Sequence, residues 1–223
     1  MQPLKASGSK EKILKRIRKA LDVKVPQPFA NIDNQTSVYT NDHHGLEMQF
    51  AKAFTELGGN FIYCEDASEF AQNFNTLLAE KNWNSIICWD KKLLELFAQK
   101  NISQITSFRD TATVDVCDAG ITGCEFLVAR TGTITLSSKQ ESGRTLSIFP
   151  PVHVVIAFTN QVVNDLKDAI SEMKQKFPER LPSLMNFATG PSRTADIEKT
   201  LVVGVHGPRE VFVFLIDEMM SDN

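Results

Sequence analysis

Segments with the composition of β-strands alternate with segments of helical periodicity between residues 46 and 100. The β-rich runs are Phe61–Cys64 and Ser85–Trp89. Helical stripes precede, separate and follow these runs, with apolar positions at Leu46, Phe50, Phe54 and Leu57, then Phe70, Phe74, Leu77 and Leu78, then Leu93, Leu94 and Phe97. Alternation of this length is typical of right-handed crossovers between parallel strands. We therefore predict an α/β fold with a mainly parallel sheet flanked by helices.

Polar residues and glycines mark the expected ends of these helices. Asp66 stands three residues before Glu69, which is the spacing of a capping box. Asp90 is a candidate N-cap of the next helix, because its carboxylate can accept from the unpaired N–H groups of the first turn. Gly58 and Gly59 are expected to end the first helix of the alternation. The local signals thus agree with the periodicity.

Helical periodicity is missing from about residue 102 until Asn160. Phe126–Ala129 and Thr133–Leu136 are β-rich, and Arg130-Thr131-Gly132 separates them. A hairpin and a sharply bulged strand both fit this pattern, since Gly132 can adopt unusual backbone angles. With the alternating segment Thr113–Val116, the pattern predicts antiparallel strands added to the sheet.

The C-terminal part combines buried strands with one long helix. His153–Ala157 has the composition of a strand that is buried on both faces. Asn160 is a candidate N-cap, and the inward positions of the helix after it are Val163, Leu166, Ile170, Met173 and Phe177. The last β-rich runs are Leu201–Val203 and Val211–Ile216, and the short link between them suits a hairpin.

The N-terminal residues form a separate pattern. Ser9 is a candidate N-cap, and Ile13, Leu14, Ile17, Ala20 and Leu21 follow at helical spacing among lysines and arginines. Such a helix could dock on a partner or a lipid surface. It could also pack on its own domain with a solvated basic face, and we favour this reading because such helices are common in ordinary domains. We expect a basic amphipathic helix over 1–22, a linker over 23–45 and the α/β domain over 46–223.

Charge and hydropathy exclude several classes of partner. The formal net charge of −3 gives no reason to expect nucleic acid or an anionic membrane as a bulk partner of the whole chain. No apolar run approaches the roughly 20 residues needed to span a bilayer. The first residues, Met1–Lys5, lack the apolar core of a signal peptide. We therefore expect a cytoplasmic protein without a membrane span.

The cysteines do not form a metal-binding pattern. Cys64, Cys88, Cys117 and Cys124 include no CxxC pair, and Cys64 and Cys88 end apolar runs, where buried reduced thiols are common. An iron–sulfur cluster takes about four ligands. His43-His44 have no third ligand nearby. We expect no metal and no cofactor in this chain.

One loop combines several features of an anion site. In the segment Gly190–Glu198, Ser192 and Thr194 are candidate N-caps of a short helix, and Asp196 falls in its first turn. Arg193 would then project where backbone N–H groups already favour anions. The candidate ligand-binding residues are Thr131, Gly132, Thr133, Arg144, Gly190, Ser192, Arg193 and Thr194. His206 is a candidate general acid or base, which Asp196 could orient.

Each candidate also has a purely structural interpretation. Thr131 and Thr133 could serve only to satisfy a turn, and Arg193 could form a surface pair with Asp196 or Glu198. His206 could be an ordinary loop histidine. His153 begins a buried strand, which favours a structural role. Glu125 could act as a nucleophile or base, but a single glutamate is a weak signal.

The order of several short motifs resembles the LUD-domain family, also called the LutC/YkgG or lactate utilization protein C family. The motifs are Gly120-Ile121-Thr122, Ala129–Thr133, Gly190–Glu198 and Gly204–Pro208. The resemblance covers roughly residues 45–217, and the nine-residue segment GPSRTADIE is its most specific part. The residue before the TGT motif is often acidic in the family, whereas it is Arg130 here. This departure implies a changed charge at that position.

The resemblance implies a fold like that of the NagB/RpiA/CoA-transferase group. It also implies a non-redox component in the oxidation of L-lactate to pyruvate, with iron–sulfur clusters on partner subunits. The expected ligand is a small carboxylate or phosphate-like anion, and a homo-oligomer is left open. An alternative is a free-standing enzyme or binding protein for a phosphorylated or CoA-linked small molecule. A third hypothesis is a scaffold whose N-terminal helix recruits a partner.

Overall fold

The computed structural model of the chain describes residues 7–22, 45–109, 114, 116–194 and 202–217. The chain divides into two units, residues 1–41 and 42–223, which are described separately. None of the helices within the described residues is both long enough and apolar enough to cross a bilayer.

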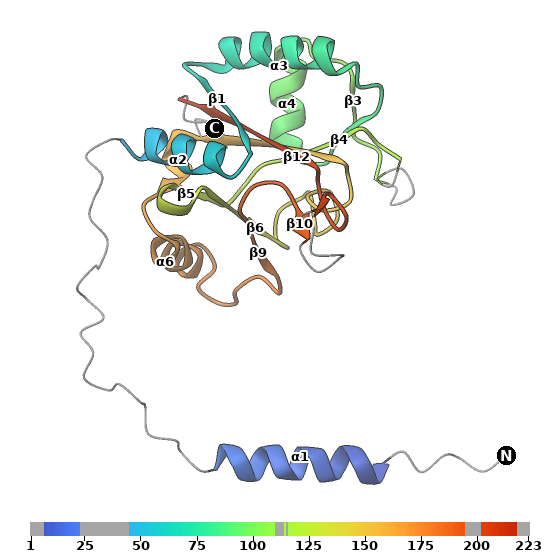
Figure 1. Cartoon of the computed structure of the whole chain (residues 1–223), viewed down its shortest axis with the longest axis vertical. Helices are drawn as coiled ribbons and strands as arrows, with labels where there is room; N and C mark the ends of the chain where they lie inside the picture. The colour runs from blue at the N-terminus through green and yellow to red at the C-terminus, as the bar shows by residue number, and fades with distance from the viewer. Residues whose placement is uncertain (1–6, 23–44, 110–113, 115, 195–201, 218–223) are drawn as a thin grey trace, which may run out of the picture. The chain divides into compact units, whose positions relative to one another are not determined.

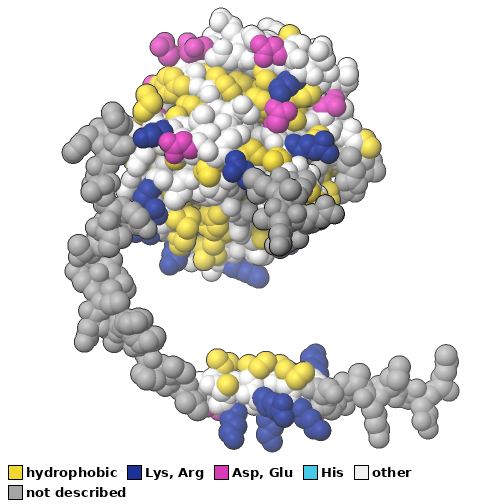
Figure 2. All heavy atoms as spheres, viewed as in Figure 1, with side chains coloured by type: hydrophobic (Ala, Val, Ile, Leu, Met, Phe, Trp, Pro, Cys, Tyr) yellow, Lys and Arg dark blue, Asp and Glu magenta, His cyan; other side chains and the backbone are white. Residues whose placement is uncertain are grey.

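The N-terminal unit contains the helix α1 (Ser7–Leu21). The helix begins two residues before Ser9, so the prediction of Ser9 as its N-cap is wrong. Arg18 and Lys19 lie in the last turn, where cations suit the helix dipole. Figure 2 shows hydrophobic side chains along one side of α1 and most of its lysine and arginine side chains on the other.

A six-stranded sheet forms the centre of the second unit (Figure 1). All of its strand pairs are parallel. In spatial order the strands are β1 (Asn60–Cys64), β12 (Glu210–Ile216), β7 (Val152–Phe158), β4 (Ala119–Thr122), β2 (Ile86–Cys88) and β3 (Ile105–Thr106). The predicted mainly parallel sheet is confirmed. Its strands are buried on both faces, which explains their nearly continuous apolar sequence.

The middle of the chain contains antiparallel strands, as predicted, but they form a second sheet and are not added to the parallel one. The spatial order of this second sheet is β8 (Val162–Val163), β5 (Phe126–Val128), β6 (Thr133–Ser137) and β9 (Met185–Ala188). Strand β6 is antiparallel to both β5 and β9, whereas β8 is parallel to β5. A 3₁₀ turn, Ala129–Thr131, and Gly132 with φ of 59° connect β5 to β6. The hairpin is thus the correct one of the two alternatives.

The helices and sheets stack in layers (Figure 1). The helices α3 (Ala67–Lys81) and α4 (Lys91–Gln99) cover one face of the parallel sheet. The helix α2 (Leu46–Glu56) and the second sheet cover its other face. The helix α6 (Leu166–Lys176) packs on β5 and β8 of the second sheet.

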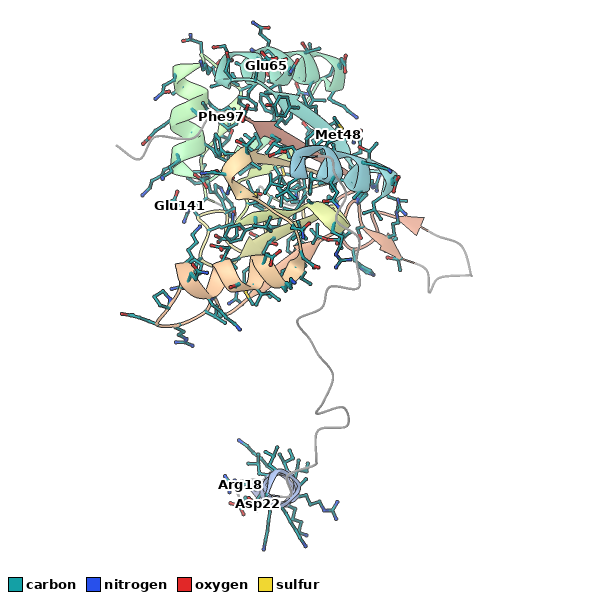
Figure 3. The ribbon with its side chains drawn as sticks, turned by 90° about the vertical axis from the view of Figure 1, so that its left-hand side faces the viewer. Arg18, Asp22, Met48, Glu65, Phe97 and Glu141 are labelled. Carbon is teal, nitrogen blue, oxygen red and sulfur yellow. The ribbon has the colours of Figure 1, made fainter. Side chains whose placement is uncertain are left out.

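Aromatic rings fill the core between the parallel sheet and α3 and α4. Phe70, Phe74, Phe97 and Phe214 are fully buried, and their ring centroids lie 5.4–6.0 Å apart. Phe97 points from α4 toward this core (Figure 3). Edge-to-face contacts such as that of Phe70 with Phe214 add to the energy of burial.

Two helices begin at the N-cap residues that the sequence predicts. The Asp66 carboxylate accepts from the N–H groups of Ser68 and Glu69 at 2.6 and 2.8 Å. These hydrogen bonds to the backbone hold the pKa of Asp66 below its ordinary value. Asp90 accepts from the N–H of Leu93 at 3.3 Å. Both N-cap predictions are confirmed, but the Glu69 carboxylate accepts from the N–H of Glu65 at 2.7 Å and not from that of Asp66, so the predicted capping box is incomplete.

Two predictions about the C-terminal part are wrong. The long helix starts at Leu166 rather than after Asn160, because Asp165 is the N-cap and forms a capping box with Asp168. Residues 159–163 instead form a 3₁₀ turn and β8. The predicted final hairpin is also absent from the described residues, since β11 (Val202–Val203) pairs with β10 (Arg193–Thr194) and β12 pairs with β1 and β7.

The aromatic core predicts a large effect of truncation at Phe74. We expect Phe74→Ala to lower the free energy of unfolding by about 3–5 kcal/mol, because it removes a fully buried ring and leaves a cavity. Phe108→Ala is the matched control, since the Phe108 side chain is 67% exposed. Urea denaturation of both variants measures the difference. Equal losses for the two variants would contradict the described core.

Candidate functional site

Three threonine hydroxyls connect two of the predicted site segments. Thr131 and Thr133 are joined by a hydrogen bond of 2.7 Å between their Oγ1 atoms, and Thr133 is joined to Thr189 by one of 2.9 Å. Thr189 directly precedes Gly190, so the turn between β5 and β6 contacts the start of the 190–194 loop. The structure therefore brings the TGT motif and this loop together.

The C-terminal turn of α2 supports both segments. A Cβ atom at Gly132 would lie 2.6 Å from the backbone nitrogen of Phe54, and one at Gly190 would lie 3.1 Å from the carbonyl oxygen of Leu57. The Arg193 guanidinium donates to the same Leu57 carbonyl. Arg193 thus satisfies a backbone acceptor at a helix C-terminus, where a cation is favourable. Its predicted partners Asp196 and Glu198 lie outside the described residues.

Ser192 connects the 190–194 loop to the loop that carries His206. The N–H of Ser192 donates to the Pro208 carbonyl at 2.9 Å, and the N–H of Gly204 donates to the Ser192 carbonyl at 2.9 Å. Because Ser192 precedes the strand β10, the prediction of Ser192 as a helix N-cap is wrong. The short helix expected after Thr194 falls on residues outside the described part of the chain.

His206 and Arg144 are exposed side chains that do not take part in the threonine hydrogen bonds. His206 is exposed and lines a depression of about 580 Å³ with Arg209, Phe149 and neighbouring residues. Arg144 is exposed and donates to the Ser183 Oγ at 2.6 Å. The structure records no direct contact of either residue with Thr131 or Thr133 among the described residues.

A larger cleft lies where three neighbouring parallel strands end. Its volume is about 880 Å³, and we call it the strand-end cleft. Its walls come from the ends of β2, β4 and β7 and the residues after them, from the start of α4, from the 139–141 segment and from the end of α6. The lining residues are Asp90–Leu93, Gly123–Phe126, Lys139–Glu141, Ile156, Phe158, Asn160, Gln161, Lys176 and Phe177. Ligands of α/β proteins commonly bind at the carboxyl ends of strands.

Glu125 is the most deeply buried charged group in this cleft. Its side chain is 3% exposed and accepts from the Ser137 Oγ at 2.5 Å and from the Lys176 ammonium at 2.8 Å. The sequence offers only a single glutamate here, because the partners of Glu125 lie 12 and 51 residues further along the chain. A buried carboxylate with a cation and a hydroxyl at its oxygens is fixed in position.

Asp90 is the second carboxylate of the cleft. Burial raises the pKa of Asp90 above its ordinary value, and the neighbouring Glu141 raises it further, although the N–H of Leu93 opposes these effects. A Cβ atom at Gly123 would lie 3.6 Å from the Asp90 Oδ2. Glu141 accepts from the N–H of Lys91 at 2.7 Å at the start of α4 (Figure 3). Asp90 is therefore suited to exchange a proton with a ligand.

Arg130 has a structural role that its sequence position did not reveal. Its guanidinium donates to both carboxylate oxygens of Asp165, at 2.9 and 3.1 Å. This hydrogen bonding from Arg130 is the main cause that holds the pKa of Asp165 below its ordinary value. Because Asp165 caps α6, the pair ties the turn between β5 and β6 to the start of that helix.

His153 is buried inside the fold, as we expect for a residue at the start of a buried strand. Its Nε2 lies 2.8 Å from the Thr122 Oγ1 on the neighbouring strand β4. Burial lowers the pKa of His153 to about 4, so the imidazole is neutral near pH 7. This supports the structural interpretation of His153.

The cysteines lie in separate parts of the core. All four are buried, and none of them forms a disulfide. Cys64 and Cys88 belong to the core beneath α3 and α4, Cys124 to the core between the sheets, and Cys117 to a smaller cluster. Burial raises the pKa of Cys88 to about 12. In the described part of the chain, no three His, Cys, Asp or Glu side chains are grouped to hold a metal ion.

Comparison with known sequences connects these motifs to one family. The sequence model of the LUD domain matches residues 47–216. Lactate utilization protein C of Shouchella clausii is 34% identical over 144 residues, which are 60% of this chain and 63% of that protein. An uncharacterized protein of Neisseria meningitidis serogroup B is 40% identical over 99 residues, which are 44% and 42% of the two chains. The chain thus matches less than two thirds of the length of these two relatives.

A further relative and a solved structure match over greater lengths. Lactate utilization protein C of Macrococcus caseolyticus is 27% identical over 223 residues, covering 94% of this chain and 96% of that protein. The crystal structure of a DUF162 family protein from Deinococcus radiodurans superposes with a TM-score of 0.59 and 20% sequence identity. It covers 77% of this chain and 96% of the other. This likeness shows a shared fold.

The buried imidazole predicts a loss of stability in mild acid. Because the unfolded histidine protonates near pH 6.5, stability from the neutral buried ring is complete above that pH and is lost as the pH falls toward about 4. Between about pH 7.5 and about pH 5 we expect wild type to lose about 2 kcal/mol more than His153→Gln. Urea denaturation across this range measures the difference. Parallel pH profiles would mean that the folded protein protonates His153 freely.

The Glu125–Lys176 pair predicts different effects of two lysines on one helix. Removing Lys176 leaves the buried Glu125 carboxylate without its cation, whereas Lys174 in the same turn is exposed. We expect Lys176→Met to destabilise the protein by about 1–2 kcal/mol, below the cost for a fully buried pair because Lys176 is itself half exposed. Lys174→Met should cost less than about 0.5 kcal/mol.

Thermal and urea denaturation of the two lysine variants measure this difference. The double variant Glu125→Gln with Lys176→Met should recover part of the loss, because it removes the uncompensated charge. If Lys176→Met is as stable as Lys174→Met, the pair does not fix Glu125 in the cleft.

Proposed function

Because the chain belongs to the LUD domain family, we propose that it is the lactate utilization protein C-like component of a lactate-utilisation system. The main support is the similarity to lactate utilization protein C of Macrococcus caseolyticus, which extends along 94% of this chain and 96% of that protein. In this proposal the chain is a non-redox subunit in the oxidation of L-lactate to pyruvate.

Separate subunits carry the iron–sulfur clusters in this proposal. The position of the cysteines supports this division, since Cys64, Cys117 and Cys124 lie in three different core clusters and their thiols are buried. A cluster needs about four converging ligands. The two electrons released when lactate becomes pyruvate would pass to the partner subunits, and this chain would hold or position the small carboxylate.

The strand-end cleft is the proposed place for that ligand. The cleft includes lysine side chains such as Lys139, whose ammonium groups suit the carboxylate of a 2-hydroxy acid. The hydroxyl of such a ligand could donate to Asp90, which faces the space beside Gly123. Phe126 and Phe158 supply apolar walls. This arrangement of a few polar groups among apolar ones is typical of small-molecule sites.

The 190–194 loop is proposed as a second, more exposed anion contact. Arg193 and the hydroxyls of Ser192 and Thr194 supply donors there, and His206 lies on the loop that contacts Ser192. In this proposal His206 exchanges a proton with the ligand or the partner subunit. Asp196, proposed to orient it, lies outside the described residues.

The volume of the strand-end cleft favours a second candidate function. A space of about 880 Å³ is larger than lactate needs, and it suits a phosphorylated or CoA-linked small molecule. In this alternative the chain is a free-standing enzyme or binding protein. Thermal-shift measurements with inorganic phosphate, sugar phosphates and CoA esters test it, because a ligand of the folded state raises the melting temperature. If none of them stabilises the protein, the alternative fails.

The lactate-utilisation role predicts a reconstituted activity. We expect the chain, purified together with iron–sulfur proteins encoded beside it, to support lactate-dependent reduction of an electron acceptor. Asp90→Asn and Arg193→Ala should each lower the rate about tenfold or more, since each removes a proposed ligand contact worth about 1.4 kcal/mol or more. Arg193→Ala should stay folded, as circular dichroism can verify. Lys174→Gln on the exposed face of α6 is the control.

Two outcomes would contradict this role. Lack of association with those iron–sulfur proteins, together with no lactate-dependent electron transfer, would overturn the proposed function. Full activity of both Asp90→Asn and Arg193→Ala would keep the pathway but remove the proposed site. Gross unfolding of Arg193→Ala would show that its contact with the Leu57 carbonyl is structural.

A further inference from the structure

The total charge of the chain conceals two regions of opposite sign. Residues 1–22 contain seven lysines and arginines and two acidic residues, which gives a net charge of +5. The remaining residues contain 17 basic and 25 acidic side chains, with a net charge of −8. The formal charge of −3 is the sum of these parts. A basic arm is therefore attached to an acidic domain.

The helix α1 concentrates this positive charge around an apolar stripe. At about 100° per residue, Ile13, Leu14, Ile17, Ala20 and Leu21 fall within an arc of roughly 120°. The large members of the stripe are exposed, with fractions of 57% for Ile13, 49% for Ile17 and 75% for Leu21. Figure 2 shows this stripe as a row of hydrophobic side chains opposite the basic ones.

Basic side chains border the stripe on both sides. Arg16 and Arg18 fall on opposite flanks of the apolar arc, and Lys12, Lys15 and Lys19 occupy the far side of the helix. In the end-on view of Figure 3, the side chains of α1 radiate around the helix, with Arg18 and Asp22 labelled. Long basic side chains can bury their methylene stems beside an apolar surface and still reach anionic groups above it.

We infer that α1 is a reversible anchor that lies flat on an anionic lipid surface. The stripe inserts between the lipid headgroups, Arg16 and Arg18 on its flanks reach the lipid phosphates, and the lysines on the far side add attraction over a longer range. The 15 residues of α1 extend about 22 Å, which is too short to span a bilayer but suits a helix in the interface plane. The net charge of the whole chain gives no reason to expect binding to such a surface, because the negative charge of the remaining residues outweighs the positive charge of residues 1–22.

The distribution of charge favours lipid over a protein groove as the occupant. An anionic membrane is a continuous plane that meets both flanks of the stripe at once and attracts every nearby cation, whatever its position. Binding should therefore depend on the number of cations rather than on one of them. The acidic remainder of the chain should not be attracted to the same surface, so that binding should reside in residues 1–22.

Vesicle sedimentation of the full-length protein tests this inference. We expect the protein to sediment with vesicles of phosphatidylglycerol mixed equally with phosphatidylcholine, and to remain in solution with phosphatidylcholine alone. Added salt should weaken the binding, because it screens the charges. A variant that lacks residues 1–22 should remain in solution with both kinds of vesicle.

Substitutions separate the contributions of the stripe and the cations. Ile17→Asp should weaken binding at least tenfold, because it places a charge in the stripe. The double variant Arg16→Gln with Arg18→Gln should weaken binding about 25-fold, since each cation near an anionic surface contributes roughly fivefold. The matched control is Lys52→Gln with Lys174→Gln, which removes two exposed charges from the domain and should bind like wild type.

The remaining outcomes would overturn the inference. Equal binding to neutral vesicles, or retained binding after removal of residues 1–22, would show that α1 and its charge are not the anchor. If the full-length protein binds neither kind of vesicle, the inference that α1 binds an anionic lipid surface is wrong. Retention of the iron–sulfur proteins by the full-length chain but not by the truncated chain would then assign α1 to a protein partner.

Discussion

Burial of the parallel sheet on both faces is the constraint on which the rest of the domain depends. Along β12, Phe212, Phe214 and Ile216 face α3 and α4, whereas Val213 and Leu215 face the second sheet. Apolar residues must therefore occupy successive positions, and most polar side chains are displaced to the strand ends. Because β2, β4 and β7 are parallel neighbours, their carboxyl ends meet at one edge, where the strand-end cleft lies.

The features that the sequence predicted correctly are those that short-range chemistry decides. The alternation of strand and helix and the N-caps Asp66 and Asp90 depend on residues within a few positions of each other. For the turn between β5 and β6 the sequence predicts either a hairpin or a bulged strand, because Gly132 permits both conformations. Only the pairing of β5 with β6 in the fold distinguishes them.

The features that were missed depend on contacts between distant residues. Asn160 and Asp165 are both good N-caps locally, but the bidentate contact with Arg130, 35 residues away, accompanies capping at Asp165. The final hairpin looked favourable from its short link, yet β12 gains two parallel neighbours in the sheet. Glu125 alone is a weak signal, and its partner Lys176 reaches it from α6, 51 residues further along the chain. No local pattern contains this information.

A property summed over the whole chain, such as its net charge, also does not show where individual residues lie. A net charge of −3 describes neither the arm nor the domain, and the position of each charge decides which surface it can meet. The same holds inside the domain, where Glu125 is neutralised by Lys176 while Asp90, in the same cleft, has a pKa raised by burial. Two carboxylates in one cleft thus differ in their partners, since Glu125 accepts from Lys176 and Ser137 whereas Asp90 accepts from the N–H of Leu93. Glu125 is thus already engaged by the protein itself, which leaves Asp90 as the carboxylate of this cleft that the proposed site assigns to a ligand.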